Sequence, residues 1–205
     1  RVHRRGPRSK ADLMTGDHEA PRTAGTVRQD LIVIEDHDPG WADAFETQKA
    51  AVEGAVRDWL VAPVEHIGST SIPGLPAKPI IDMLAVIDDY QAFEPALSAL
   101  ERIGWAPAPE PGDEDRRKWS ACFPTVEHRT HHLHVVEHDS VGWRDWLLFR
   151  DYLRTHNEDV VRYAELKKEL ASADHSDRVR YRMGKAPLIA EIMERARAWS
   201  ETGSK

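Results

Sequence analysis

The stretch Val64–Val86, VEHIGSTSIPGLPAKPIIDMLAV, constrains the fold of this chain more than any other segment. Both of its ends predict strands, because Val64–Ile67 is rich in β-branched residues and Ile80–Ile87 is an apolar run. Between them lie three prolines, two glycines and three small hydroxyl residues, a composition that excludes regular structure. The sequence therefore predicts two strands joined by an irregular loop.

The loop carries groups that suit a phosphate. Gly68 has no side chain, so a phosphate can approach backbone N–H groups there, and the Ser69 and Thr70 hydroxyls can donate to it. Lys78 adds a cation, and Asp82, inside the second strand, would hold a metal against the phosphate, since a carboxylate in an apolar strand needs a partner. A plain turn between two core strands is the alternative interpretation of the Gly-Ser pair.

A second pattern is the His-x-His strand. His132 and His134 flank Leu133 in an apolar run, so the two-residue period places both imidazoles on one face. If Asp82 occupies the same face of a neighbouring strand, the three residues form a metal-binding and catalytic group, which Glu65 could join as a fourth ligand. The alternative is that the histidines hydrogen-bond to neighbours without any metal.

These stretches resemble the GrpB family, an uncharacterised family of the nucleotidyltransferase superfamily that also occurs fused to some dephospho-CoA kinases. The resemblance is carried by EHIGSTSIPGL at Glu65–Leu75, KPIIDM at Lys78–Met83, RTHHLHVV at Arg129–Val136, FRDYLR at Phe149–Arg154, and the pairs Tyr163 with Lys167 and Tyr181 with Lys185. It implies phosphate-binding roles for the basic and hydroxyl groups of these stretches, Arg150 among them. The superfamily motif places Asp-x-Asp or Asp-x-Glu after Gly-Ser, and this chain has Leu84 at the second acidic position.

The resemblance implies an α+β fold of nucleotidyltransferase type, with a small mixed β-sheet, flanking helices and a helical C-terminal half. We expect a disordered basic tail over residues 1–28, which hold few large apolar residues, and one domain over residues 29–200. Within that domain the apolar patterns predict a strand at Leu31–Ile34, a hairpin of Trp119–Phe123 with His131–Val136, and helices divided near Asn157. A last helix is expected to start at Gly184 to Pro187.

Three functions remain open on this basis. The first is a domain that binds a nucleotide or another phosphorylated ligand and transfers a nucleotidyl group with a divalent metal, Mg, Mn or Zn, using a nucleoside triphosphate. The second is a non-catalytic accessory module related to the domain fused to dephospho-CoA kinase, with an association with coenzyme A biosynthesis implied by the resemblance alone. The third is a metal-dependent hydrolase that uses the His-x-His strand.

The amino-acid composition limits which binding partners and which cellular compartment we expect. The formal charge is −7, and the tail is basic, so the rest of the chain is more acidic still and is disfavoured as a nucleic-acid binder. One cysteine, Cys122, excludes an internal disulfide, and no stretch is apolar enough for a membrane span. We therefore expect a cytoplasmic protein whose partner is a small phosphorylated molecule.

Overall fold

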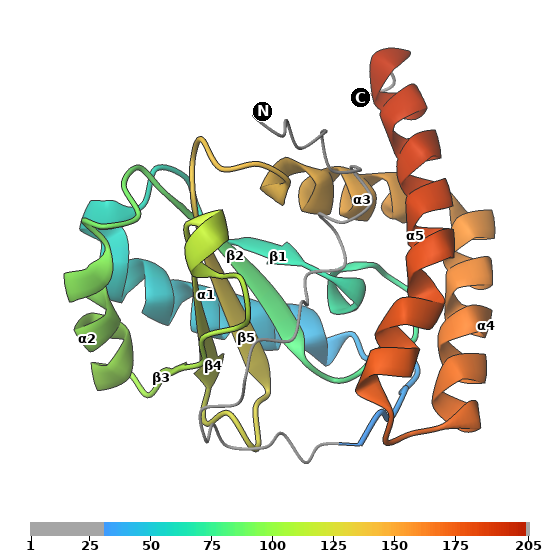
Figure 1. Cartoon of the computed structure of the whole chain (residues 1–205), viewed down its shortest axis with the longest axis horizontal. Helices are drawn as coiled ribbons and strands as arrows, with labels where there is room; N and C mark the ends of the chain where they lie inside the picture. Colours follow the sequence, from blue (N-terminus) through green and yellow to red (C-terminus); the bar gives the residue numbers. More distant parts are fainter. Residues whose placement is uncertain (1–30, 204–205) are drawn as a thin grey trace, which may run out of the picture.

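The computed structural model describes residues 31–203, so the predicted tail over residues 1–28 lies outside the described residues. Five strands form one mixed sheet in the order β1-β2-β5-β4-β3 (Figure 1). The strands are β1 (Glu65–Ile67), β2 (Ile81–Ile87), β3 (Ala106–Pro107), β4 (Lys118–Phe123) and β5 (His131–Glu137). The α+β prediction is confirmed, with β2 and β5 parallel and the other pairs antiparallel.

Helices cover both faces of the sheet. On one face lie α1 (Gly40–Val56) and α2 (Glu94–Arg102), and on the other lies α3 (Trp143–Thr155). The last two helices, α4 (Asn157–Ala173) and α5 (Arg178–Glu201), pack on α3 and on the loop between β1 and β2. Figure 1 shows α3 across the top of the molecule, with α4 and α5 side by side at the right. Within the described residues, no helix is long and apolar enough to cross a membrane.

The main apolar core lies between the sheet and the first helical layer. Met83, Leu133 and Val135 point from the central strands toward Phe45 and Val52 of α1, and all five side chains are buried. The alternate residues of the same strands point the other way, where Leu84, Val86 and Val136 pack against α3. Strand alternation therefore assigns one face of β2 and β5 to the core and leaves part of the other face for polar groups.

The predicted hairpin is confirmed, since β4 and β5 pair antiparallel from Lys118 with Val136 to Phe123 with His131. The strand predicted at Leu31–Ile34 is wrong. The chain forms only a single bridge there, between Glu35 and Ala77, and then turns toward α1. Leu31 and Val33 are each 51% exposed, so these side chains of the apolar run face solvent and are not covered by a neighbouring layer.

The predicted start of the last helix is also wrong, because α5 begins at Arg178, where the Asp177 side chain accepts a hydrogen bond from the Arg180 N–H. Pro187 lies inside the helix. Gly184 serves close helix packing, since an added Cβ there would come 2.6 Å from the Leu170 side chain of α4. The earlier start brings Tyr181 and Lys185 onto the first two turns of α5.

Candidate metal and phosphate site

Asp82, His132 and His134 come together on the face of the sheet that α3 covers. The parallel pairing of β2 with β5 sets Asp82 beside His132 and Leu84 beside His134. The Asp82 Oδ1 atom lies 3.7 Å from His132 Nδ1 and 3.7 Å from His134 Nε2. The three residues can each offer one ligand atom within 4.8 Å of the others, which makes them a candidate metal site.

The geometry of these atoms fits a metal ion better than direct hydrogen bonds. A distance of 3.7 Å is too long for a hydrogen bond. Metal bonds of about 2.1 Å at tetrahedral angles would separate two ligand atoms by about 3.4 Å. Burial, helped by the neighbouring His134, lowers the pKa of His132 well below its usual value, so this imidazole is neutral at pH 7, the form that ligates metals.

Asp82 is held as a carboxylate. Burial raises its pKa, but the interactions with the His134 and His132 side chains and with the Arg129 guanidinium together outweigh burial, so the net shift is downward. An ionised carboxylate between two imidazoles, with open directions left for other ligands, is a donor set that zinc, manganese or iron accepts.

Gly68 packs directly over this carboxylate. Its φ of 70° is in the left-handed region, and an added Cβ would overlap Asp82 Oδ2. The backbone that follows forms a short 3₁₀ turn, Ser69–Ser71, which the Ser71 hydroxyl closes by donating to the Gly68 carbonyl at 2.6 Å. Only glycine fits here, and it brings the start of the loop into contact with the cluster.

The other residues of the loop have different surroundings. Thr70 is buried, its hydroxyl lies 2.9 Å from His66 Nε2, and it points toward the β1 side of the loop. Lys78 is half-buried at the far end of the loop, just before β2. The structure therefore brings Gly68 to the cluster, while the Ser69 side chain contacts Tyr163 of α4 and Thr70 contacts His66 of β1.

Two arginines of α3 hold the loop and β1 in place. Arg150 is buried and donates to the His66 carbonyl at 2.9 Å and to Glu65 Oε2 at 2.7 Å. Arg154 donates to the Ser71 carbonyl through Nε at 3.0 Å and Nη2 at 2.9 Å. Glu65 is thus engaged by Arg150 and is not part of the cluster formed by Asp82 and the two histidines.

A Tyr-Lys pair on α4 contacts the loop from the helical half, and a second Tyr-Lys pair lies on α5. Lys167 lies over the Tyr163 ring at 4.6 Å and Lys185 over the Tyr181 ring at 4.5 Å, as expected for residues four apart on a helix. Tyr163 contacts the Ser69 side chain, and burial raises its pKa to about 12. The Lys167 amine donates to the Pro76 carbonyl of the loop.

Both lysines lie where burial makes their charged forms costly. Burial lowers the pKa of Lys167 to about 7, with Lys185 adding to the shift, and burial lowers the pKa of Lys185 to about 8 although Asp82 opposes the shift. Within the part of the chain that the structure describes, neither amine forms an ion pair with a carboxylate. A bound anion such as a phosphate would relieve this cost.

Glu110 is the residue that the sequence did not single out. It lies on the acidic, proline-rich loop between β3 and β4, and its Oε1 atom is 3.8 Å from His132 Nε2, the nitrogen that faces away from Asp82. Lys118, which is buried, holds Glu110 at 3.0 Å and lies 3.4 Å from His134 Nδ1. Burial raises the pKa of Glu110, but the interactions with His132, Lys118 and His134 outweigh burial and hold this pKa well below its usual range.

A mixed sheet with a helical half packed over a histidine-carboxylate cluster defines the class of this protein as an α+β domain with a candidate metal site. Residues 31–195 match the sequence model of a protein family that is described as GrpB protein. The chain belongs to the GrpB family.

The comparisons with individual proteins agree. The chain is 37% identical over 162 residues to UPF0157 protein YqkA of Bacillus subtilis, an alignment that covers 78% of this chain and 46% of that protein. A crystal structure of conserved protein GrpB from Enterococcus faecalis overlaps with a TM-score of 0.70 at 32% identity and covers 80% of this chain and 96% of that chain. The chain thus spans about half the length of the Bacillus relative.

A looser overlap relates the chain to Cid1, described as having RNA terminal uridylyl transferase activity. Its TM-score is 0.43 at 14% identity, and it covers 66% of this chain and 42% of that chain.

Proposed function

We propose that this domain binds a nucleoside triphosphate together with a divalent metal and transfers its nucleotidyl group to an acceptor hydroxyl. The observation that carries the proposal is the close approach of Gly68 to the Asp82 carboxylate. The start of the loop, where we propose that phosphate binds, therefore lies next to the candidate metal ligands Asp82, His132 and His134. Lys167 of α4, which is buried, and Lys185 of α5, which is half-buried, complete a set of donors for a triphosphate.

Each residue has a distinct task in this reaction. The metal would be held by Asp82, His132 and His134 and would supply charge stabilisation at the reacting phosphate. Ser69 and the backbone after Gly68 would orient the phosphates, and Lys167 and Lys185 would neutralise them. The acceptor oxygen attacks the α-phosphorus, the bond to the β-phosphate oxygen breaks, pyrophosphate leaves, and the hydroxyl proton passes to solvent.

The substitution of the superfamily's second acid by Leu84 is offset on the adjacent strand. Leu84 is fully buried and packs with Val86 and Val136, and its partner in the parallel register is His134. The imidazole therefore stands beside the position where a second carboxylate would be. A His-rich donor set favours zinc or manganese over magnesium.

Gly68→Ala tests the proposal, with Gly74→Ala as the matched control. The two glycines have similar positive φ values, 70° and 77°, so both changes strain the backbone, but only a methyl at position 68 meets Asp82, and nothing lies within 4 Å of one at position 74. We expect calorimetry with ATP and manganese to show binding by the parent and by Gly74→Ala, and at least a tenfold loss for Gly68→Ala. Equal affinities in the two folded variants would refute the loop assignment.

Metal analysis tests the cluster separately. His132→Ala and His134→Ala should each lose bound zinc or manganese, since each ligand orients the others, while His128→Ala, on an exposed turn, should keep the parent's metal content. Parent-like metal content in both site variants would remove the metal from the proposal.

Hydrolysis is a second candidate, favoured by the two imidazoles, which are typical ligands of zinc hydrolases. Here water replaces the acceptor hydroxyl and the same bond breaks. Product analysis separates the two reactions, because transfer leaves the nucleotidyl group on an added acceptor, whereas hydrolysis gives nucleoside monophosphate and pyrophosphate whether or not an acceptor is present.

A further inference from the structure

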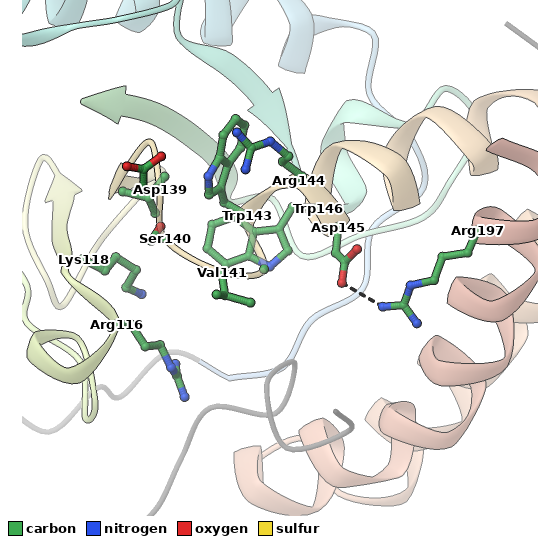
Figure 2. Close-up of a pocket in the computed structure, with 12 residues that line it drawn as sticks. Arg116, Lys118, Asp139, Ser140, Val141, Trp143, Arg144, Asp145, Trp146 and Arg197 are labelled. Carbon is green, nitrogen blue, oxygen red and sulfur yellow. Dashed lines mark hydrogen bonds and ion pairs between the residues drawn. The ribbon is translucent and has the colours of Figure 1, made fainter. Parts of the chain in front are cut away.

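A cavity of about 420 Å³ lies next to the His-x-His strand, at the far end of β5. Its walls come from the turn before β4, the end of β5, the start of α3 and the C-terminal part of α5, as Figure 2 shows. A volume of this size matches sites for small molecules, which run from about 300 to about 1,000 Å³. None of the predicted phosphate-loop residues lines it.

The cavity adjoins the metal-type cluster through two shared residues. Lys118 lines the cavity and lies 3.4 Å from His134 Nδ1, and the Trp146 ring lies 5.2 Å from the His134 ring. Val136, two residues beyond His134 on the same face of β5, forms part of the floor. A molecule in the cavity would therefore lie beside the cluster, next to Lys118 and Trp146.

The lining combines aromatic rings with an excess of cations. The rings are the indoles of Trp143 and Trp146, and four cations line the cavity against two carboxylates. These charged residues are Arg116, Lys118, Arg144, Arg197, Asp139 and Asp145. The Arg197 guanidinium pairs with Asp145 at 2.8 Å, and Arg144 lies over the Trp143 ring at 4.4 Å. This leaves Arg116 and Arg144 without a carboxylate partner among residues 31–203, so the lining favours a flat ring that carries a negative charge.

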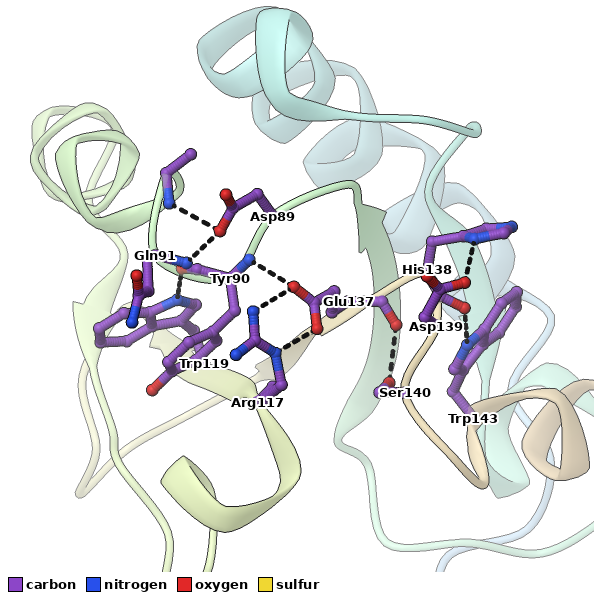
Figure 3. Close-up of polar contacts among 11 residues, drawn as sticks. Asp89, Tyr90, Gln91, Arg117, Trp119, Glu137, His138, Asp139, Ser140 and Trp143 are labelled. Carbon is purple, nitrogen blue, oxygen red and sulfur yellow. Dashed lines mark hydrogen bonds and ion pairs between the residues drawn. The ribbon is translucent and has the colours of Figure 1, made fainter.

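The wall of the cavity is built in advance of any ligand. The Trp143 indole N–H donates to the His138 carbonyl at 3.2 Å, and the Ser140 hydroxyl donates to the Glu137 carbonyl at 2.7 Å, which fixes the turn between β5 and α3 (Figure 3). Figure 3 also shows Arg117 paired with Glu137 on the other side of β5.

Arg117 has a φ of 51°, a left-handed conformation that is rare outside glycine. It turns Arg117 toward Glu137, while the preceding Arg116 lines the cavity. The two consecutive arginines thus have different neighbours, Glu137 for Arg117 and the cavity for Arg116.

We propose that this cavity binds a small aromatic anion, a planar ring bearing a carboxylate or a phosphate. Ring binding comes from Trp143 and Trp146, and charge recognition comes from Arg116 and Arg144. Binding does not depend on the proposed nucleotidyl transfer, although a ligand here would be placed to act as its second substrate.

Naphthoate serves as the test ligand, titrated by calorimetry into the full chain in metal-free buffer without nucleotide, with naphthyl phosphate as a second anion and naphthalenemethanol as the neutral counterpart. We expect saturable binding of at least one of the anions and at least tenfold weaker binding of the alcohol. Trp143→Leu and Arg116→Gln should each weaken anion binding at least tenfold. Trp59→Leu, near the opposite face, and Arg162→Gln on α4 are the matched controls and should bind like the parent.

Asp82→Asn separates this proposal from the metal site, because it should lose metal but bind naphthoate like the parent. The cavity proposal is overturned if neither anion binds, if the neutral alcohol binds as well as the anions, or if Trp143→Leu and Arg116→Gln, shown to be folded by thermal melting, bind like the controls.

Discussion

The two faces of the central sheet are made from alternate residues of the same strands, yet they differ in every property that matters for function. Met83 and Leu133 point to the α1 side and are fully buried among apolar side chains. Their neighbours Asp82, His132 and His134 point to the α3 side. There His132 lies near the Glu110 carboxylate, and Asp82 lies near the Lys185 amine. One strand pair thus supplies both a rigid support and a polar cluster.

The difference teaches how the cluster is kept in shape. The Asp82 carboxylate lies 3.7 Å from each imidazole, too far for direct hydrogen bonds, so the separation of the three groups depends on the register of β2 with β5. That register is set by the apolar face, because a shift of one residue would send Met83 and Leu133 to the polar side. Changes on the two faces should therefore separate stability from ligand binding.

The largest expected effect is loss of the metal in Asp82→Asn. The amide keeps the shape of the side chain but removes the charge between the two imidazoles, so we expect zinc or manganese affinity to fall at least about 100-fold. The folded state lowers the pKa of Asp82, so the carboxylate contributes stability above its unfolded pKa, and this contribution is lost as the pH falls. At pH 7 the variant should lose no more than about 1 kcal/mol of unfolding free energy in metal-free buffer.

Asp88→Asn, at the exposed end of β2, is the control and should keep both metal and stability. A large loss of stability in metal-free Asp82→Asn would show that this carboxylate is a structural partner of its neighbours, and the contrast between the two faces would fail.

Leu133→Ala gives the opposite result on the other face. The residue is fully buried between His132 and His134, so truncation leaves a cavity in the core and should cost about 2 to 5 kcal/mol of unfolding free energy. Metal affinity at a temperature where the variant is folded should change less than in Asp82→Asn. Urea unfolding and metal titration on the same sample check both. A loss of metal as complete as in Asp82→Asn would mean that the two faces are not separable.

Lys167→Met tests the buried cation of the helical half. Its pKa is about 7 in the folded chain and about 10.4 in an unfolded one, so the unfolded chain binds more protons between these values. Unfolding free energy should therefore rise as the pH increases from about 7 to about 10, by an amount on the order of a few kcal/mol, and the rise should be smaller in Lys167→Met.

Lys168→Met, the exposed neighbour paired with Asp36, is the control and should keep the parent's pH dependence in urea unfolding from about pH 6 to about pH 10. If all three proteins show the same dependence, Lys167 is not held as a strained cation, and its part in binding a triphosphate loses its physical basis.

Sequence reasoning reached the polar face of the strands but not what surrounds it. The alternation of His132, Leu133 and His134 predicts one face directly, and Asp82 stands out as the carboxylate of an apolar strand. Their pairing depends on a parallel alignment across α2, β3 and β4, which no local pattern encodes. Glu110 could not be predicted, because its approach to His132 depends on the course of an irregular loop and on its pairing with Lys118.

The smallest effect is expected from Glu110→Gln, which sharpens the description of the polar face. His132 turns Nδ1 toward Asp82 and Nε2 toward Glu110, so the second carboxylate favours a proton on Nε2 and leaves Nδ1 as the ligand atom. Partners of this kind behind a metal-binding histidine contribute about 10- to 100-fold in metal affinity, and we expect a loss of affinity near the lower limit because Glu110 Oε1 lies 3.8 Å from His132 Nε2.

Two control variants accompany this test. Glu114→Gln, exposed on the same loop, should show no loss of metal affinity, and Glu110→Asp should recover little because its shorter side chain cannot reach His132. Metal titration of the three variants decides the matter, and equal affinities for Glu110→Gln and Glu114→Gln would show that Glu110 serves only to neutralise Lys118.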